Sequence, residues 1–117
     1  MADPHPLSVP VYQILLSLAT GDAHGYALIR DIRERTAGEV DLTASTLYGA
    51  LQRMLEEAWI VETGEDTESG GPRRRVYAIT DAGRNVAADE ARRLHRAARH
   101  AVEVRLLDAD GLRPRIP

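Results

Sequence analysis

The chain has 117 residues, of which 44% are hydrophobic, with a formal net charge of −3 and no cysteine. This length suffices for one small domain and one additional element, and the absence of cysteine excludes disulfides and thiolate-bound metals. The acidic balance argues against a generally basic nucleic-acid binder, so such a role must rest on the local distribution of charge. Phenylalanine is absent and the apolar residues are mainly Ala, Leu, Val and Ile, which favours helices over a β-sandwich.

Two short helices are predicted at the start of the chain. The first starts near Ser8 and ends before Gly21, with Pro10 at its beginning and apolar residues at helical spacing after it. The second follows an N-cap at Asp22 and continues to Gly38, with a narrow apolar face and opposite charges four residues apart on its outer side.

A third helix is predicted to follow an N-cap at Thr43 and to have two unlike faces. One face carries an apolar stripe, and the row of residues opposite that stripe is small and polar. This polar row contains a glycine in mid-helix, Gly49. A glycine there destabilises the helix by roughly 1 kcal/mol relative to alanine. Two explanations stay open: the backbone approaches a partner closely at this position, or the glycine is simply tolerated on a solvated face. Its apolar stripe, at i, i+4, i+7 and i+11, comprises Leu47, Leu51, Met54 and Ala58.

The second half of the chain predicts a hairpin followed by a long helix. The runs "WIVET" and "RRRVYAIT" flank the turn-rich stretch "GEDTESGGP", and a last helix follows an N-cap at Thr80 and continues to about Leu107. Three short helices and a hairpin are the layout of a winged helix-turn-helix, whose third helix enters the major groove. We therefore predict an α+β, mainly α chain: a winged helix-turn-helix domain at 8–80, a C-terminal dimerisation helix at 81–107 and a tail at 108–117.

Three stretches of the sequence resemble, in their order and spacing, the PadR family of bacterial transcriptional regulators: "HGYALIRDIRERTAG", "LTASTLYGALQRMLEEAWI" and "GGPRRRVYAITDAGR". The resemblance covers about Val11 to Arg84. It implies a homodimeric repressor that occupies a palindromic operator in double-stranded DNA and is released by a small-molecule effector. The chain departs from the family pattern at Ala44 and Gly49, where proline is usual, and at Ala58, where glycine is usual. Only one helix fits after the hairpin, which resembles the short-tailed branch of the family.

Candidate DNA-binding residues come from the third helix, the arginine-rich strand of the wing and the start of the second helix. Polar groups on a helix can contact base edges or phosphates, wing arginines can clamp the backbone, and helix N-termini commonly hold a phosphate. For Tyr26 a place in the core is an equally good interpretation, because it lies on an apolar stripe. The predicted set is Ser45, Thr46, Tyr48, Gly49, Gln52, Arg53, Arg73, Arg74, His24 and Tyr26.

The last helix is predicted to form the dimer interface. Its stripe of small residues would let a partner backbone come close, and a helix of this length cannot be buried by so small a domain. The alternative is that the helix folds back over the first helix of its own chain. The predicted interface residues are Ala87, Ala91, Leu94, Ala98 and Ala101.

No metal, cofactor or catalytic site is expected. His95 and His100 stand five residues apart, which does not stack them on one helical face, and the sequence has no nucleophile elbow or phosphate-binding glycine loop. We expect a cytoplasmic protein with no membrane segment, because the longest apolar run is too short for a bilayer and the N-terminus lacks the basic region of a signal peptide.

An effector would have to find its aromatic contacts outside the last helix, because residues 81–107 contain no Trp, Tyr or Phe. Trp59, otherwise expected in the core, and Tyr12 of the first helix are the candidates. A second function also stays open: a winged-helix protein-interaction module that does not bind DNA, suggested by the net charge and by the acidic loop at Glu65, Asp66 and Glu68. Steep salt dependence of DNA binding would favour the DNA-binding function.

Overall fold

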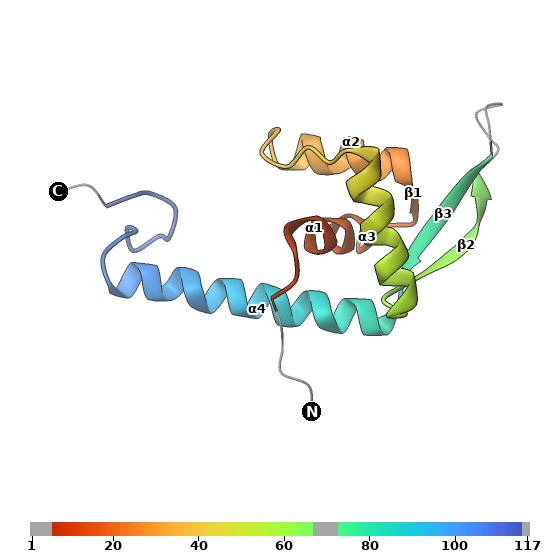
Figure 1. Cartoon of the computed structure of the whole chain (residues 1–117). Coiled ribbons are helices and arrows are strands. Elements are labelled where there is room, and N and C mark those ends of the chain that lie inside the picture. The colour runs from red at the N-terminus through yellow and green to blue at the C-terminus, as the bar shows by residue number, and fades with distance from the viewer. Residues whose placement is uncertain (1–5, 67–72, 116–117) are drawn as a thin grey trace.

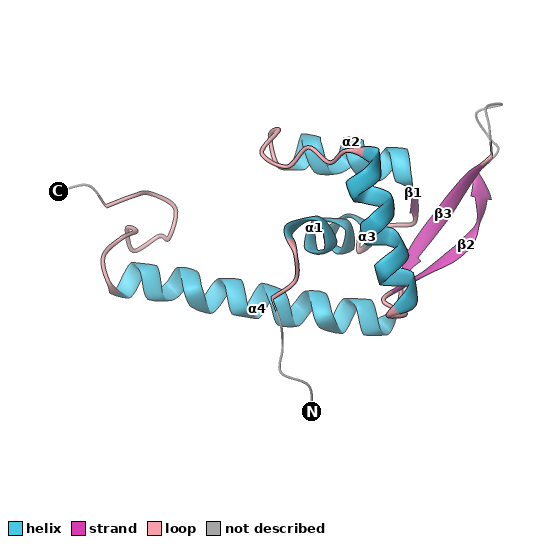
Figure 2. Ribbon diagram, viewed as in Figure 1, coloured by secondary structure: helices cyan, strands magenta, loops and turns pink. Residues whose placement is uncertain are grey.

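The computed structural model describes residues 6–66 and 73–115 of the chain. Within these residues the elements follow in the order α1 (Val9–Leu18), β1 (Ala23–His24), α2 (Gly25–Arg35), α3 (Ala44–Glu56), β2 (Ile60–Asp66), β3 (Arg74–Ile79) and α4 (Asp81–Glu103) (Figure 1). The three strands form a small antiparallel sheet beside a mainly helical body (Figure 2). The predicted fold class is therefore confirmed.

The hydrophobic core lies between the first three helices and the base of the sheet. The apolar stripe predicted on α3 is buried at its first three positions, whereas the fourth, Ala58, is exposed. The inclusion of Ala58 was wrong because α3 ends at Glu56 and Ala58 turns into the left-handed region with φ +59°. The largest fully buried side chains are Ile14, Leu15, Leu18, Leu28, Ile32, Leu47, Leu51, Met54 and Ile60.

The predicted N-caps at Thr43 and Thr80 are confirmed, and Ser8, near which the first helix was predicted to start, is the N-cap of α1. The side-chain oxygens of Ser8, Thr43 and Thr80 each accept a hydrogen bond from the backbone N–H three residues later, with N···O distances of 3.3, 3.1 and 3.0 Å. Each cap satisfies one of the backbone donors that the first turn of a helix leaves unpaired. The starts of α1, α3 and α4 are thus set by local sequence.

The predicted N-cap at Asp22 was wrong. Ala23 and His24 form the short strand β1, which pairs antiparallel with β3. This pairing holds the two residues extended, so the helix cannot begin before them. His24 is the N-cap instead, with its Nδ1 accepting a hydrogen bond from the N–H of Ala27 at 3.1 Å. The edge of the sheet is thereby joined directly to the start of α2.

The predicted hairpin is confirmed, with β3 between β1 and β2. Strand β2 runs from Ile60 opposite Ile79 to Asp66 opposite Arg74, with a register shift between Glu62 and Gly64. It is longer than expected, so Glu65 and Asp66 belong to the strand and not to a loop. Glu68, the third acidic residue named for the predicted loop, lies outside the described residues.

Helix α4 begins with a close contact and ends earlier than expected. A Cβ at Gly83 would overlap the carbonyl oxygen of Trp59, so only glycine lets α4 approach the α3–β2 corner this closely. The helix ends at Glu103 and not near Leu107, and the chain turns through Arg105 with φ +66°. In the described part of the chain no helix is both long and apolar enough to cross a membrane.

Candidate nucleic-acid interface

The outer face of α3 is exposed and polar. Its buried side chains fix the rotation of the helix, so the opposite side stands open to solvent. Gly49 faces open space, since no atom beyond its chain neighbours and the backbone of its own helix lies within 4 Å of the position that a Cβ would occupy. The amide of Gln52 donates to Glu56 Oε1 at 3.3 Å on the surface. All six predicted residues of α3 are exposed on it: Ser45, Thr46, Tyr48, Gly49, Gln52 and Arg53.

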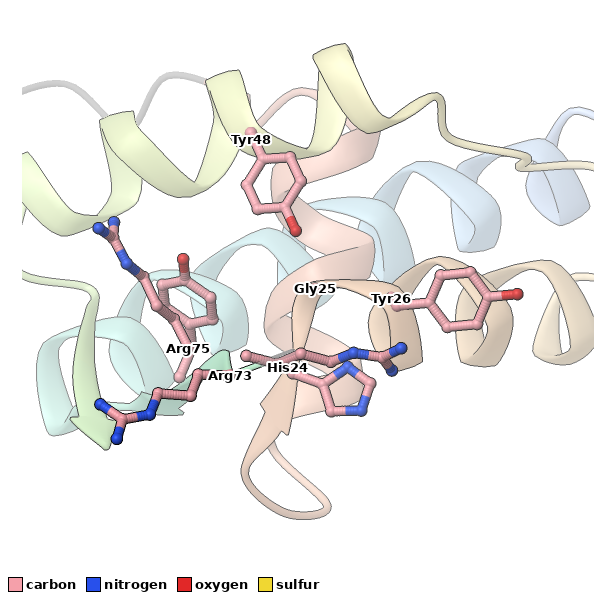
Figure 3. A pocket seen from close by; sticks show the side chains of 8 residues that line it. His24, Gly25, Tyr26, Tyr48, Arg73 and Arg75 are labelled. Atoms are coloured by element: carbon pink, nitrogen blue, oxygen red, sulfur yellow. The ribbon is translucent and has the colours of Figure 1, made fainter. Parts of the chain in front are cut away.

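A pocket of about 410 Å³ lies beside α3, between the start of α2 and strand β3 (Figure 3). It brings together predicted residues from three separate segments of the chain. Sequence reasoning missed three of its members, Gly25, Arg75 and Tyr77, although Gly25 follows the predicted His24 and Arg75 follows the predicted Arg74. The lining residues are His24, Gly25, Tyr26, Tyr48, Arg73, Arg74, Arg75 and Tyr77.

Tyr26 joins the wing to α2. Its side chain is 60% exposed, so the alternative of a core tyrosine was wrong. The guanidinium carbons of Arg74 and Arg30 lie 5.5 and 5.9 Å from the centroid of its ring. Such cation–π contacts at exposed sites contribute about 0.5–1 kcal/mol. The ring thus holds the Arg74 guanidinium over the beginning of α2, at the mouth of the pocket.

The other two wing arginines face carboxylates of the neighbouring strand. Arg73 Nη1 lies 3.6 Å from Glu65 Oε2, and Arg75 Nε lies 3.4 Å from Glu62 Oε1. Exposed ion pairs of this kind contribute only about 0–1 kcal/mol, so a phosphate can exchange with the carboxylates at little cost. Glu62 and Glu65 of β2 are thus each paired with an arginine, which weakens the reason for a module that avoids DNA.

Gly25 makes room for Tyr48. A Cβ at position 25 would lie 2.9 Å from the Tyr48 hydroxyl oxygen and 3.2 Å from its Cζ. The ring therefore reaches from α3 toward the start of α2, with its hydroxyl directed at Gly25 (Figure 3). Tyr77 also lines the pocket, and its phenol is protonated at neutral pH, since burial and the nearby Glu62 raise its pKa further above the ordinary alkaline value. The pocket floor is thus uncharged and its rim is cationic.

The predicted dimer residues divide into two groups. Ala87 packs against the core of its own domain, and Ala101 is half-buried. The central part of the stripe, Ala91, Leu94 and Ala98, is exposed, with Leu94 at 41%. The first half of α4 does lie along α1, as the folded-back alternative expected, whereas the second half extends away from the domain (Figure 2).

The remaining predicted residues lie outside the pocket. Trp59 is half-buried against the core and Tyr12 is half-buried on α1, and neither lines the pocket. His100 Nδ1 lies 3.4 Å from Glu103 Oε2 on the exposed part of α4. Among residues 6–66 and 73–115 there is no group of three or more potential metal ligands. The absence of a cofactor or catalytic site in the protein stays a prediction.

A three-helix core with the polar face of α3 exposed beside an arginine-bearing hairpin defines a winged helix-turn-helix protein. The model of the transcriptional regulator PadR-like family matches residues 14–89, which is more than half of the chain. The chain therefore belongs to the PadR-like family of transcriptional regulators. The resemblance seen in the sequence is confirmed.

Solved structures of the same fold agree with this assignment. A PadR family transcription regulator from hypervirulent Clostridium difficile R20291 has a TM-score of 0.72 and 25% identity, covering 83% of this chain and 98% of its own. Pex from Synechococcus has a TM-score of 0.61 and 29% identity, covering 78% and 86%. Bacillus subtilis PadR in complex with operator DNA has a TM-score of 0.63 and 24% identity, covering 72% and 47%. No curated protein sequence matches the chain.

Proposed function

We propose that this protein is a homodimeric repressor that binds a palindromic operator through α3 and the wing. The observation that carries the proposal is the exposed polar face of α3 bordering a pocket with three arginines at its rim. Bacillus subtilis PadR, a protein of the same fold, was solved in complex with operator DNA, which supports this use of the fold.

The exposed groups divide between base and backbone contacts. Ser45, Gln52 and Arg53 can donate to or accept from base edges in the major groove, where hydrogen-bond patterns distinguish the base pairs. Arg74 and the Tyr48 hydroxyl lie at the pocket between α2, α3 and the wing, where a DNA phosphate would meet a guanidinium and a hydroxyl together. Backbone contacts position the protein and base contacts give it specificity.

Dimerisation would use the part of α4 that its own domain leaves uncovered. The exposed stripe at Ala91, Leu94 and Ala98 has small side chains that allow close packing of a second helix. A two-fold dimer would place two α3 helices about one turn of DNA apart, which is the geometry that a palindromic operator requires.

A small molecule that releases the protein from its operator would bind at Trp59 or Tyr12. Both are aromatic residues outside α4, and neither lines the pocket. Trp59 is the only tryptophan of the chain, so its fluorescence reports on whether an effector contacts it. Quenching of this fluorescence by an inducer that also weakens operator binding would support a site at Trp59. Tight binding of an inducer with unchanged Trp59 fluorescence would count against a site at Trp59 and leave Tyr12 as the candidate.

A footprint on the DNA upstream of the gene and its neighbours tests the proposed function. We expect a protected segment with two-fold symmetric sequence, and lower expression of a reporter placed behind it when the protein is present. No protection at low salt would argue for a protein-interaction module. Protection together with increased expression would keep the DNA-binding role and replace repression with activation.

A further inference from the structure

Glu90 is the one buried charged side chain among residues 6–65 and 73–115, at 5% exposure. Its carboxylate accepts a hydrogen bond from the backbone N–H of Leu7 at 3.2 Å, across the fold. It also accepts from both Nε and Nη2 of Arg93 on the same helix, the first at 3.0 Å. The carboxylate therefore links α4 to the segment that leads into α1.

Arg93 and the Leu7 N–H together lower the pKa of Glu90 below its ordinary value, so the carboxylate is charged at neutral pH. Burying a charge requires strong compensation, and replacing buried ion pairs with apolar residues is often neutral or stabilising. Fold stability alone is therefore a weak explanation for a carboxylate at this position. Buried polar groups of this kind can instead fix one arrangement among several that are similarly stable.

Glu90 occupies the point where α4 leaves the domain. From residue 91 to residue 100 only Arg93 is even half-buried, and the helix extends away from the body (Figure 1). This arm reaches from residue 91 to residue 103, about 20 Å at 1.5 Å per residue. The Leu7–Glu90–Arg93 contacts are thus the last anchor between α4 and the domain before the arm begins.

A small change in that angle would be large on the scale of DNA. A tilt of about 10° at Glu90 moves the end of an arm of about 20 Å by roughly 3.5 Å. One base-pair step along DNA is about 3.4 Å. If two arms join the two protomers, such a tilt changes the separation of the two α3 helices by about one base pair.

We propose that Glu90 is a positioning residue that fixes the angle between α4 and the DNA-binding domain and thereby sets the separation of the two operator half-sites. The claim that Glu90 sets the half-site separation rests on the proposed dimeric function, whereas the claim that it fixes the angle of α4 does not. Glu90 itself contacts no DNA. Its loss should leave the recognition of each half-site unchanged and affect only the distance between them.

The fixed angle can be measured without DNA. The chain has no cysteine, so spin labels at Arg33→Cys on α2 and Arg99→Cys on the arm mark only those two exposed positions. Diluting labelled chains with unlabelled protein leaves one labelled protomer per dimer, so electron–electron resonance gives the distance within one chain. Glu90→Leu keeps an apolar filling at the site, and a thermal melt verifies that this variant folds.

Arg92→Ala is the matched control, because Arg92 lies two positions after Glu90 on the same helix and forms an exposed pair with Asp89. We expect one narrow distance distribution in the wild type and in Arg92→Ala. In Glu90→Leu the distribution should widen or shift by about 3 Å or more. An unchanged distribution in a folded Glu90→Leu variant would overturn the proposal.

Selection from a random duplex library tests the consequence for DNA. The wild type and Arg92→Ala should recover paired half-sites at one separation, and Glu90→Leu should recover the same half-sites at separations spread by one base pair or more. A single sharp separation with Glu90→Leu would overturn the role in spacing. Recovery of unpaired half-sites by the wild type would contradict both the proposed palindromic operator and the role of Glu90 in spacing. The distance measurement would still decide whether Glu90 fixes the angle of α4.

Discussion

Replacing Gly49 with alanine should stabilise the fold and weaken DNA binding at the same time. Gly49 lies in the middle of α3, and the new methyl group would meet no atom within 4 Å beyond its chain neighbours and the backbone of its own helix. The substitution therefore causes no clash in the free protein and removes a helix penalty of about 1 kcal/mol. For a domain of this size that gain corresponds to a rise in Tm of about 4–8 °C.

In the complex the same methyl group stands on the face proposed to lie against the bases. Overpacking a close contact costs about 1–3 kcal/mol, and 1.4 kcal/mol is a factor of ten in affinity. We therefore expect operator affinity to fall about tenfold. Thermal melting by circular dichroism and binding by fluorescence anisotropy measure both effects on one preparation. A higher Tm with unchanged affinity would refute the close approach and leave Gly49 as a residue tolerated on a solvated face.

Three further substitutions test other parts of the structure. Leu94→Arg should place like charges across the two-fold axis, dissociate the dimer in sedimentation velocity at micromolar concentration and abolish operator binding without unfolding the domain; a variant that stays dimeric would contradict the interface. Ala58→Gly should raise the free energy of unfolding in urea by about 0.5–1 kcal/mol, because Ala58 has φ +59°, and a loss of stability would contradict this. Gly83→Ala should lower it by about 1–3 kcal/mol, because the new methyl overlaps the Trp59 carbonyl oxygen; an unchanged unfolding curve would show that α4 can shift freely.

Local signals in the sequence were enough to predict most of the fold. The N-caps at Ser8, Thr43 and Thr80 use short polar side chains that bond to the next turn of backbone, and such bonds need no tertiary partner. The hairpin was also predictable, because its two β-rich runs flank a stretch rich in turn-forming residues. The exposed residues of α3 followed from the position of its apolar stripe.

The errors arose where distant contacts decide the conformation. Asp22 is the better N-cap by local preference, but pairing of Ala23 and His24 with β3 moves the start of α2. Tyr26 has the spacing of a core residue, yet the wing supplies it with an arginine partner on the surface. Burial of Glu90 was equally hidden, because its partner Leu7 is far away in sequence and contributes only a backbone N–H.

The salt dependence of operator affinity tests most directly whether α3 and the wing bind DNA. Binding that neutralises phosphates releases counterions, so the logarithm of the binding constant falls linearly with the logarithm of salt concentration. We predict that operator affinity falls steeply with salt for the wild type and for the control Arg99→Ala. For Arg74→Ala we predict a slope that is shallower by roughly 1 for each Arg74 lost, with the sequence preference unchanged. A wild-type slope near zero, or no binding at low salt, would contradict the proposed role of α3 and the wing.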